Sequence, residues 1–283
     1  MEMNIASPKS VKELLEKHSI APLKRYGQNF LTDGNIADKI AEAAVPKGAF
    51  ALEIGPGLGA LTQRLLERCG MVAAYEIDSG LVRSLKETFE GETRLKIFHE
   101  DFLKADIQSE LKQLMPGGIY VAANLPYYIT TDCIMKLICS GLGIKAITVM
   151  VQTEFAERML ALPGSAQYGM LGAITGFLAS ATVLFDVAPS CFYPKPHVGS
   201  SVVRLEMKEV DFEYAKKYLL IVKSLFSARR KTVKSNLRHA LGLTAEQAET
   251  VLKSAEIEEN ARAESLSAAD IQRIVQMYNI SIY

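Results

Sequence analysis

The chain lacks closely spaced cysteine pairs and an excess of basic residues. It therefore shows no sign of a disulfide scaffold, a zinc protein or a general binder of polyanions. Its four cysteines, Cys69, Cys133, Cys139 and Cys191, form no C-x-x-C pair. We therefore expect reduced and mostly buried thiols in a cytosolic protein, not disulfides or a metal site. No sign of charge predominates either, because 32 Lys and Arg balance 32 Asp and Glu. Bulk charge thus favours neither a nucleic acid nor a membrane as partner.

Long apolar runs are also scarce. Residues 1–19 carry both signs of charge and no apolar signal core, so no targeting segment is expected. The uncharged stretch 169–185 is slightly short for a membrane span, contains Gly, Thr and Ser, and ends at Asp186. It predicts a buried helix followed by a strand. We expect a cytoplasmic protein with no membrane association.

Short apolar, β-rich runs alternate with helical patterns over the first two hundred residues. Predicted strands cover residues 49–54, 71–77, 94–98, 119–123, 146–152, 181–187 and 201–206. Predicted helices between them include residues 34–44, 60–68, 79–89 and 132–139. This alternation predicts an α/β fold with a Rossmann-like, seven-stranded and mostly parallel sheet covered on both faces.

After about residue 208 the strand pattern stops. The remaining helical patterns cover residues 212–227, 231–241, 245–255 and 268–278. Thr244 and Gln247 have the spacing of a capping box at the start of the third of these helices. We therefore expect two domains, an α/β domain at residues 1–207 and a small all-helical domain at residues 208–283, with no internal repeat.

A basic block lies within the predicted helical domain. Residues 215–245 contain eight Lys or Arg and no acidic residue. The candidates for phosphate contact are Arg229, Arg230, Lys231, Lys234 and Arg238. The last three have a spacing that places them on one helix face. Such a stripe can position RNA without reading its sequence, although a solvated helix face is the other interpretation of a run of charges.

A glycine-rich loop follows the strand predicted at residues 49–54 and opens a helix. Gly55, Gly57 and Ala60 fit the dinucleotide pattern G-x-G-x-x-G/A, and Glu76 follows about 20 residues later, where a ribose-binding acid is expected. Glycines at this point allow the backbone to approach a ligand at the carboxyl end of the sheet. The loop alone does not distinguish a nicotinamide dinucleotide from another nucleoside cofactor.

Charge favours S-adenosylmethionine. Glu53, beside the loop, would repel a pyrophosphate, whereas S-adenosylmethionine has no phosphate and carries a sulfonium and an ammonium. Glu76 could accept both ribose hydroxyls, and Asp101 could accept a bond from the adenine amino group. The alternative interpretation is that these acids only cap strands and helices.

The sequence Asn124-Leu125-Pro126-Tyr127 follows the apolar run 119–123, where a buried strand ends. The amide oxygen of Asn124 and a nearby backbone carbonyl can accept both N–H bonds of an exocyclic amine, while Tyr127 stacks on its ring. These acceptors would also stabilise the positive charge that develops on the nitrogen. The motif therefore predicts methylation of a base amine, on a base outside its stack.

Together these segments resemble the ribosomal RNA adenine N6,N6-dimethyltransferase family, which includes the bacterial small-subunit enzyme and the macrolide-resistance rRNA methylases. The resemblance covers residues 23–241. Its motifs are residues 24–31, 53–62, 76–78, Asp101, residues 124–127, 192–201 and 226–232. The resemblance implies dimethylation of two adjacent adenosines in a 3′-terminal hairpin of small-subunit rRNA, by a monomer acting on a pre-ribosomal small subunit.

The resemblance also implies roles for individual residues. Asn29 and Leu31 would close over the cofactor, and Tyr127 and Phe192 would bracket the flipped adenine. The cofactor contacts implied in full are Asn29, Leu31, Gly55, Glu76, Asp101 and Asn124, and no metal is expected. Three alternatives stay open: a DNA adenine methylase, a non-catalytic assembly or transcription factor, and a nicotinamide dehydrogenase.

Overall fold

The computed structural model describes residues 4–22, 27–112, 114, 117–126 and 128–282, with side chains up to residue 278. The chain forms two compact units. The first consists of Met1–Ala156 with Thr182–Met207, and the second of Glu157–Ala181 with Lys208–Tyr283. One boundary between the units follows residue 207, and the second unit also takes in Glu157–Ala181, which the sequence analysis placed in the α/β domain.

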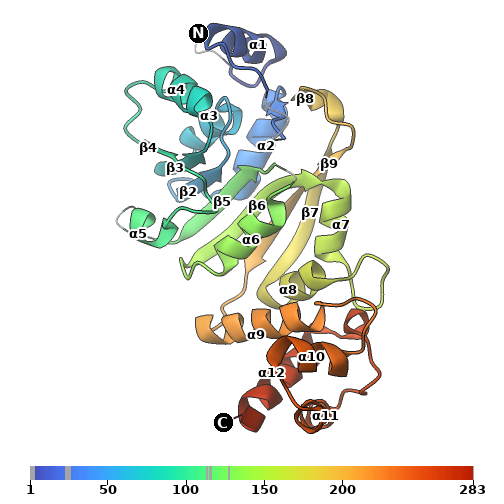
Figure 1. Cartoon of the computed structure of the whole chain (residues 1–283). Helices are drawn as coiled ribbons and strands as arrows, with labels where there is room; N and C mark the ends of the chain where they lie inside the picture. The colour runs from blue at the N-terminus through green and yellow to red at the C-terminus, as the bar shows by residue number, and fades with distance from the viewer. Residues whose placement is uncertain (1–3, 23–26, 113, 115–116, 127, 283) are drawn as a thin grey trace. The chain divides into compact units, whose positions relative to one another are not determined.

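The first unit is built on a seven-stranded sheet with the order β4-β3-β2-β5-β6-β9-β7 (Figure 1). The strands are β2 (Phe50–Ile54), β3 (Met71–Glu76), β4 (Leu95–His99), β5 (Ile119–Asn124), β6 (Ile144–Gln152), β7 (Ala179–Val187) and β9 (Ser200–Met207). Strands β2 to β6 pair in parallel, and β9 runs antiparallel to β6. The predicted Rossmann-like, mostly parallel sheet is confirmed.

Helices cover this sheet because their apolar positions recur on one side. In α2 (Gly34–Ala44) the buried residues Ala37, Ile40, Ala41 and Ala44 form one helical face. This face packs against β5, β6, β9 and α3 (Ala60–Leu66). The other helices of the unit are α4 (Ser79–Thr88), α5 (Ile107–Leu111), α6 (Thr130–Ile138) and α7 (Thr153–Leu160), the last of which runs into the second unit.

Two features of the first unit were not predicted from the sequence. One is the N-terminal helix α1 (Pro8–Lys17). The other is a two-stranded antiparallel ribbon formed by β1 (Phe30–Leu31) and β8 (Phe192–Tyr193). Strand β8 directly follows a short 3-10 turn at Pro189–Cys191. Strands of two residues are too short to show a periodic pattern, so the sequence gives no signal for them.

Apart from the first residues of β7, the regular structure among the described residues of the second unit is entirely helical. Its helices are α8 (Met170–Leu178), α9 (Phe212–Leu225), α10 (Val233–Leu241), α11 (Ala245–Ser254) and α12 (Ala268–Ile282), with a 3-10 turn at Ala263–Ser265. The predicted capping box is confirmed, since Thr244 and Gln247 bond reciprocally at the start of α11. The predicted helix and strand in residues 169–185 are confirmed as α8 and β7. No helix in the described part of the chain is long and apolar enough to span a membrane.

Candidate active site

A cavity of about 360 Å³ lies at the carboxyl ends of the central strands, within the first unit. Ligands of doubly wound sheets bind at this edge, because the loops there are free to diverge around them. The cavity is lined by six residues that the sequence predicted as cofactor contacts: Asn29, Leu31, Gly55, Glu76, Asp101 and Asn124. The structure thus brings together residues from five separate stretches of chain.

The glycine loop between β2 and α3 shapes one wall of the cavity. Gly55 and Gly57 have φ angles of +68° and +61°, in the left-handed region that favours glycine. A Cβ at Gly57 would lie 3.2 Å from the ring of Phe30, so this glycine allows close packing. A Cβ at Gly55 would meet only Pro126, at 4.0 Å, and both residues line the cavity. Gly55 therefore leaves space into which a ligand can fit.

Glu76 is a buried carboxyl at the end of β3. Its Oε2 accepts a hydrogen bond from the Gly57 backbone N–H at 3.1 Å, and its Oε1 accepts one from the Asp78 N–H at 3.0 Å. Burial raises the pKa of Glu76 to about 7, and the backbone donors oppose that rise. Asp78 itself caps α4 by accepting from the N–H groups of Gly80 and Leu81.

Glu53 lies deeper, with 1% of its surface exposed. It accepts a hydrogen bond from the Thr62 hydroxyl at 2.6 Å. Burial raises the pKa of Glu53 to about 8, the bond from Thr62 opposes this, and the nearby charge of Glu76 adds to it. The carboxyl is therefore mostly protonated at pH 7. This corrects the charge argument made from the sequence, which treated Glu53 as an anion that would repel a pyrophosphate.

Asp101 follows β4 and is half-buried. Its Oδ1 accepts from the Leu103 N–H at 3.0 Å, and its Oδ2 lies 3.8 Å from the Lys104 ammonium. The bond to Leu103 fixes the carboxylate at the cavity wall, where Phe102 and Leu103 are its neighbours. The arrangement suits an acceptor for an amino group beside an apolar ring.

Asn124, at the end of β5, contacts the segment that precedes β1. Its Nδ2 donates to the Asn29 backbone carbonyl at 3.1 Å, and the Asn29 side chain donates to the Gly27 carbonyl at 3.1 Å. Because the amide nitrogen is held by Asn29, the amide oxygen is the atom that can accept from a ligand. Tyr127, the predicted stacking residue, lies outside the described residues.

Phe192 does not reach the cavity in this structure. It is 5% exposed, belongs to the hydrophobic core and pairs with Leu31 across the ribbon. Two exposed residues that the sequence did not single out line the cavity instead: Tyr128, at 57% exposure, and Ile77, at 42%. Ile77 lies inside the motif 76–78 and Tyr128 directly follows the motif 124–127, and that position is the signal that could have found them.

The predicted basic residues lie in the second unit. Arg229, Arg230 and Lys231 are exposed in the turn before α10, and Arg238 is exposed on that helix. Arg229 lies 3.8 Å from Glu264. Lys234 differs, because its ammonium is held by Glu249 at 2.9 Å and Glu259 at 2.5 Å. The predicted stripe is therefore interrupted by an ion-paired lysine, and Lys231 precedes the helix.

A sheet of this order, with a glycine loop after β2 and acids after β3 and β4, defines a Rossmann-like methyltransferase. The model of the family "Ribosomal RNA adenine dimethylase" matches residues 22–279. The chain belongs to this family and is an S-adenosylmethionine-dependent rRNA adenine methyltransferase.

Relatives with the name ribosomal RNA small subunit methyltransferase A are similar over nearly the full length. The protein of Alkaliphilus oremlandii is 39% identical over 93% of this chain and 94% of its own. The protein of Shouchella clausii is 40% identical over 97% of this chain and 95% of its own.

Two crystal structures are also similar. A dimethyladenosine transferase from Plasmodium falciparum has a TM-score of 0.73 at 27% identity, covering 89% of this chain and 98% of its own. The 23S rRNA methyltransferase ErmE has a TM-score of 0.63 at 26% identity, covering 89% and 100%.

Proposed function

We propose that this protein dimethylates N6 of two adjacent adenosines in a 3′-terminal hairpin of small-subunit rRNA. The observation that carries the proposal is the shared cavity, in which the Asn124 amide lies with Glu76, Asp101 and the glycine loop. The names of the relatives support the small subunit as the source of the RNA.

The cavity residues fit S-adenosylmethionine, which when bound supplies an electrophilic methyl group. Glu76 has two carboxyl oxygens on backbone donors and would exchange one or both of these bonds for ribose hydroxyls. Asp101 would accept from the adenine amino group. Gly55 leaves room for the ligand, and Asn29 and Leu31 would cover it from the ribbon side.

Asn124 would act on the target amine. Its oxygen accepts one N–H of the adenine, and the bond from its nitrogen to Asn29 holds the amide in that orientation. The Pro126 carbonyl already accepts from Ile129 N–H and from the Thr130 hydroxyl, both at 3.2 Å. The carbonyl of Leu125 is therefore the candidate for the second acceptor. Two such acceptors stabilise the positive charge that develops on the nitrogen, and Tyr127 would stack on the ring. Phe192, buried in the core, does not line this cavity.

The test is methylation with labelled S-adenosylmethionine of naked small-subunit rRNA, naked large-subunit rRNA and isolated small subunits lacking the modification, followed by mapping of the labelled base. We expect two adjacent N6,N6-dimethyladenosines in the small-subunit RNA. Label on large-subunit RNA, or on no substrate, would contradict the proposal.

The second unit would hold the RNA. Arg229, Arg230, Lys231 and Arg238 are exposed and suited to phosphate contact, and Lys234, held by two carboxylates, would contribute least. We further propose that a monomer acts in the cytoplasm on the pre-ribosomal small subunit. A preference for particles over naked RNA in the same methylation assay would support this substrate.

A further inference from the structure

The ribbon beside the cavity presents an aromatic ring outward. Tyr193 and Phe192 are neighbours on β8, so their side chains point to opposite faces. Phe192 is buried in the core, whereas Tyr193 is 40% exposed. Pairing with β1 fixes the position of the ring, because Tyr193 lies opposite Phe30 and the Thr32 N–H donates to the Cys191 carbonyl at 2.8 Å.

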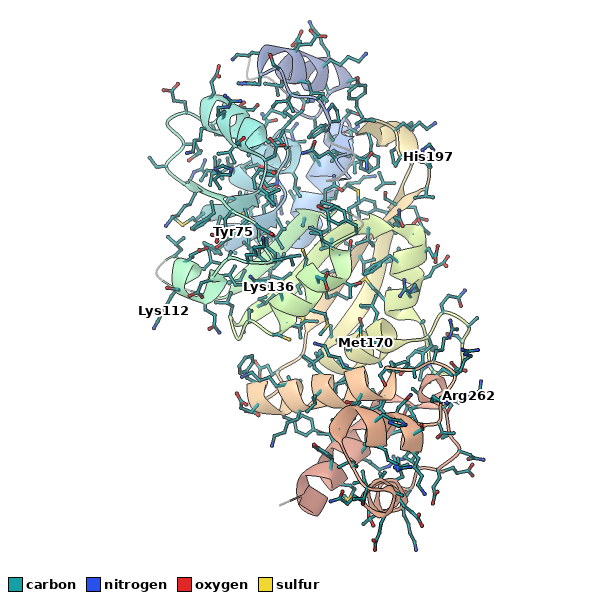
Figure 2. The ribbon with its side chains drawn as sticks, in the orientation of Figure 1. Tyr75, Lys112, Lys136, Met170, His197 and Arg262 are labelled. Carbon is teal, nitrogen blue, oxygen red and sulfur yellow. The ribbon has the colours of Figure 1, made fainter. Side chains whose placement is uncertain are left out.

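One lysine lies over this ring, and a second lies close to it in the sequence. The Lys12 ammonium, on α1, lies 5.9 Å from the centre of the Tyr193 ring, within the range of a cation–π contact. Lys195 follows two residues after the tyrosine and is exposed, as is His197 in the same loop (Figure 2). Within the described part of the chain neither Lys12 nor Lys195 forms an ion pair, whereas Lys9 and Lys17 on the same helix pair with Glu13 and Glu87.

The place of this patch suggests its ligand. Phe30, which lines the cavity, pairs with Tyr193 across the ribbon, so the backbone that carries the exposed ring is the neighbour of a residue of the cavity wall. A nucleotide next to the target adenosine would leave the cavity over this ribbon. Sites that bind single-stranded nucleic acid combine exposed aromatic rings with nearby cations, because bases stack on the rings and phosphates pair with the cations.

We propose that Lys12, Tyr193 and Lys195 form a second RNA-binding surface, on the methyltransferase unit, for nucleotides that flank the target adenosine. This proposal rests on the proposed function. The tyrosine provides a stacking platform for an unpaired base, and the lysines contact the phosphates on either side. The surface shares no residue with the proposed basic contacts of the second unit or with the cofactor contacts.

The test uses the full chain and a synthetic RNA hairpin with two adjacent adenosines in its loop. The double variant Lys12→Ala, Lys195→Ala should reduce the slope of log affinity against log salt concentration by about 1.4–1.8 units, from two lost phosphate contacts. Tyr193→Ala should weaken binding roughly tenfold by loss of one stacked base, and Tyr193→Phe should restore it. In turnover, the KM for RNA should rise while kcat stays near that of the wild type.

Lys96→Ala is the matched control, because Lys96 is an exposed lysine that lies 5.0 Å from the Phe98 ring on the edge strand β4. It should leave the salt slope unchanged. If the lysine double variant keeps the wild-type slope, the surface does not bind RNA phosphates, whatever happens at Tyr193. Normal hairpin binding with weaker binding to intact subunits would assign the patch to a ribosomal protein and overturn the proposal. Methylation of the hairpin by the wild type tests the proposed function separately.

Discussion

Asn124 illustrates how much of the site depends on the orientation of one side chain. An amide has one donor and one acceptor end, and only the oxygen can bind an amine hydrogen. The bond from Asn124 Nδ2 to the Asn29 carbonyl decides which end is available. A residue more than ninety positions earlier in the chain therefore sets the polarity of the proposed catalytic group.

Replacement of Asn124 by Ala should lower kcat by roughly 10²–10³-fold, because one preorganised acceptor of the transition-state charge is lost. The affinity for S-adenosylmethionine, measured by calorimetry, should change much less. Single-turnover methylation on the hairpin gives the chemical rate directly. A variant that methylates at a near-normal rate would exclude Asn124 from the chemistry.

The buried carboxyl of Glu53 should make the stability of the folded protein depend on pH. Its pKa is about 8 in the folded protein, raised by burial from the ordinary glutamate value of 4.5. A group with a raised folded pKa binds more protons when folded, so its stabilising contribution is present below pH 4.5 and is lost as the pH rises through 8. We expect the free energy of unfolding, without added cofactor, to decrease between about pH 5 and pH 8.

The matched variant is Glu53→Gln, whose amide oxygen can still accept from Thr62 but does not ionise. Chemical denaturation across the same range should show a flatter dependence on pH. An equal slope in the variant and the wild type would mean that Glu53 titrates normally.

The sequence predicted which residues line the cavity better than it predicted their surroundings. Glycines, acids and an amide at strand ends mark a ligand site in the sequence, and the structure places all six predicted cofactor contacts around one cavity. The protonation of Glu53 and the burial of Phe192 could not be predicted, because both depend on packing between distant segments.

Among the elements, α3 depends most on a single glycine. Gly59 is the residue before the helix, has a φ of +95°, and has no space for a side chain: a Cβ would lie 2.6 Å from the Phe89 ring. Gly91 also has a positive φ, +81°, but a Cβ there would meet nothing within 4 Å.

Comparison of Ala substitutions at Gly91 and Gly59 separates the stability lost to backbone strain from the stability lost to crowding. Gly91→Ala should cost roughly 1–2 kcal/mol, the cost of a left-handed alanine. Gly59→Ala should cost more, because the Phe89 ring must also move, and it should weaken cofactor binding through the adjacent loop. Thermal denaturation and cofactor affinity measure the two effects. Equal losses for both variants would show that Phe89 adapts freely.

Elements with a strong period or a cap were predicted well from the sequence. Helix α2 has the predicted bounds, and the seven strands of the sheet end within two residues of prediction. The ribbon of β1 and β8 was missed because two-residue strands have no period. It forms because residues 30–31 and 192–193 meet through the tertiary fold, which local sequence does not encode.

At the scale of the whole molecule, catalysis and RNA binding are proposed to reside largely in separate units. Replacement of Arg229, Arg230 and Lys231 by Ala should lower the salt slope of RNA binding by about 2–2.7 units. Cofactor affinity, a property of the first unit, should not change. Lys234→Ala serves as the control, since its two carboxylate partners already neutralise it, and it should change the slope least. An unchanged slope in the triple variant would contradict a phosphate role for this turn.

The second unit is assembled from two stretches of chain that are separated in the sequence by part of the first. Phe177, from the earlier stretch, stacks on Tyr218, from the later one, with ring centres 3.9 Å apart, and the Tyr218 hydroxyl donates to the Ala173 carbonyl at 3.0 Å. A fragment cut after Met207 would keep α8 and lose the helix that buries its aromatic face. We expect such a fragment to aggregate, as light scattering would show, and a monodisperse fragment would refute this. A single break in the chain therefore cannot release the second unit intact, because its hydrophobic core is shared between segments on either side of Thr182–Met207, which belongs to the first unit.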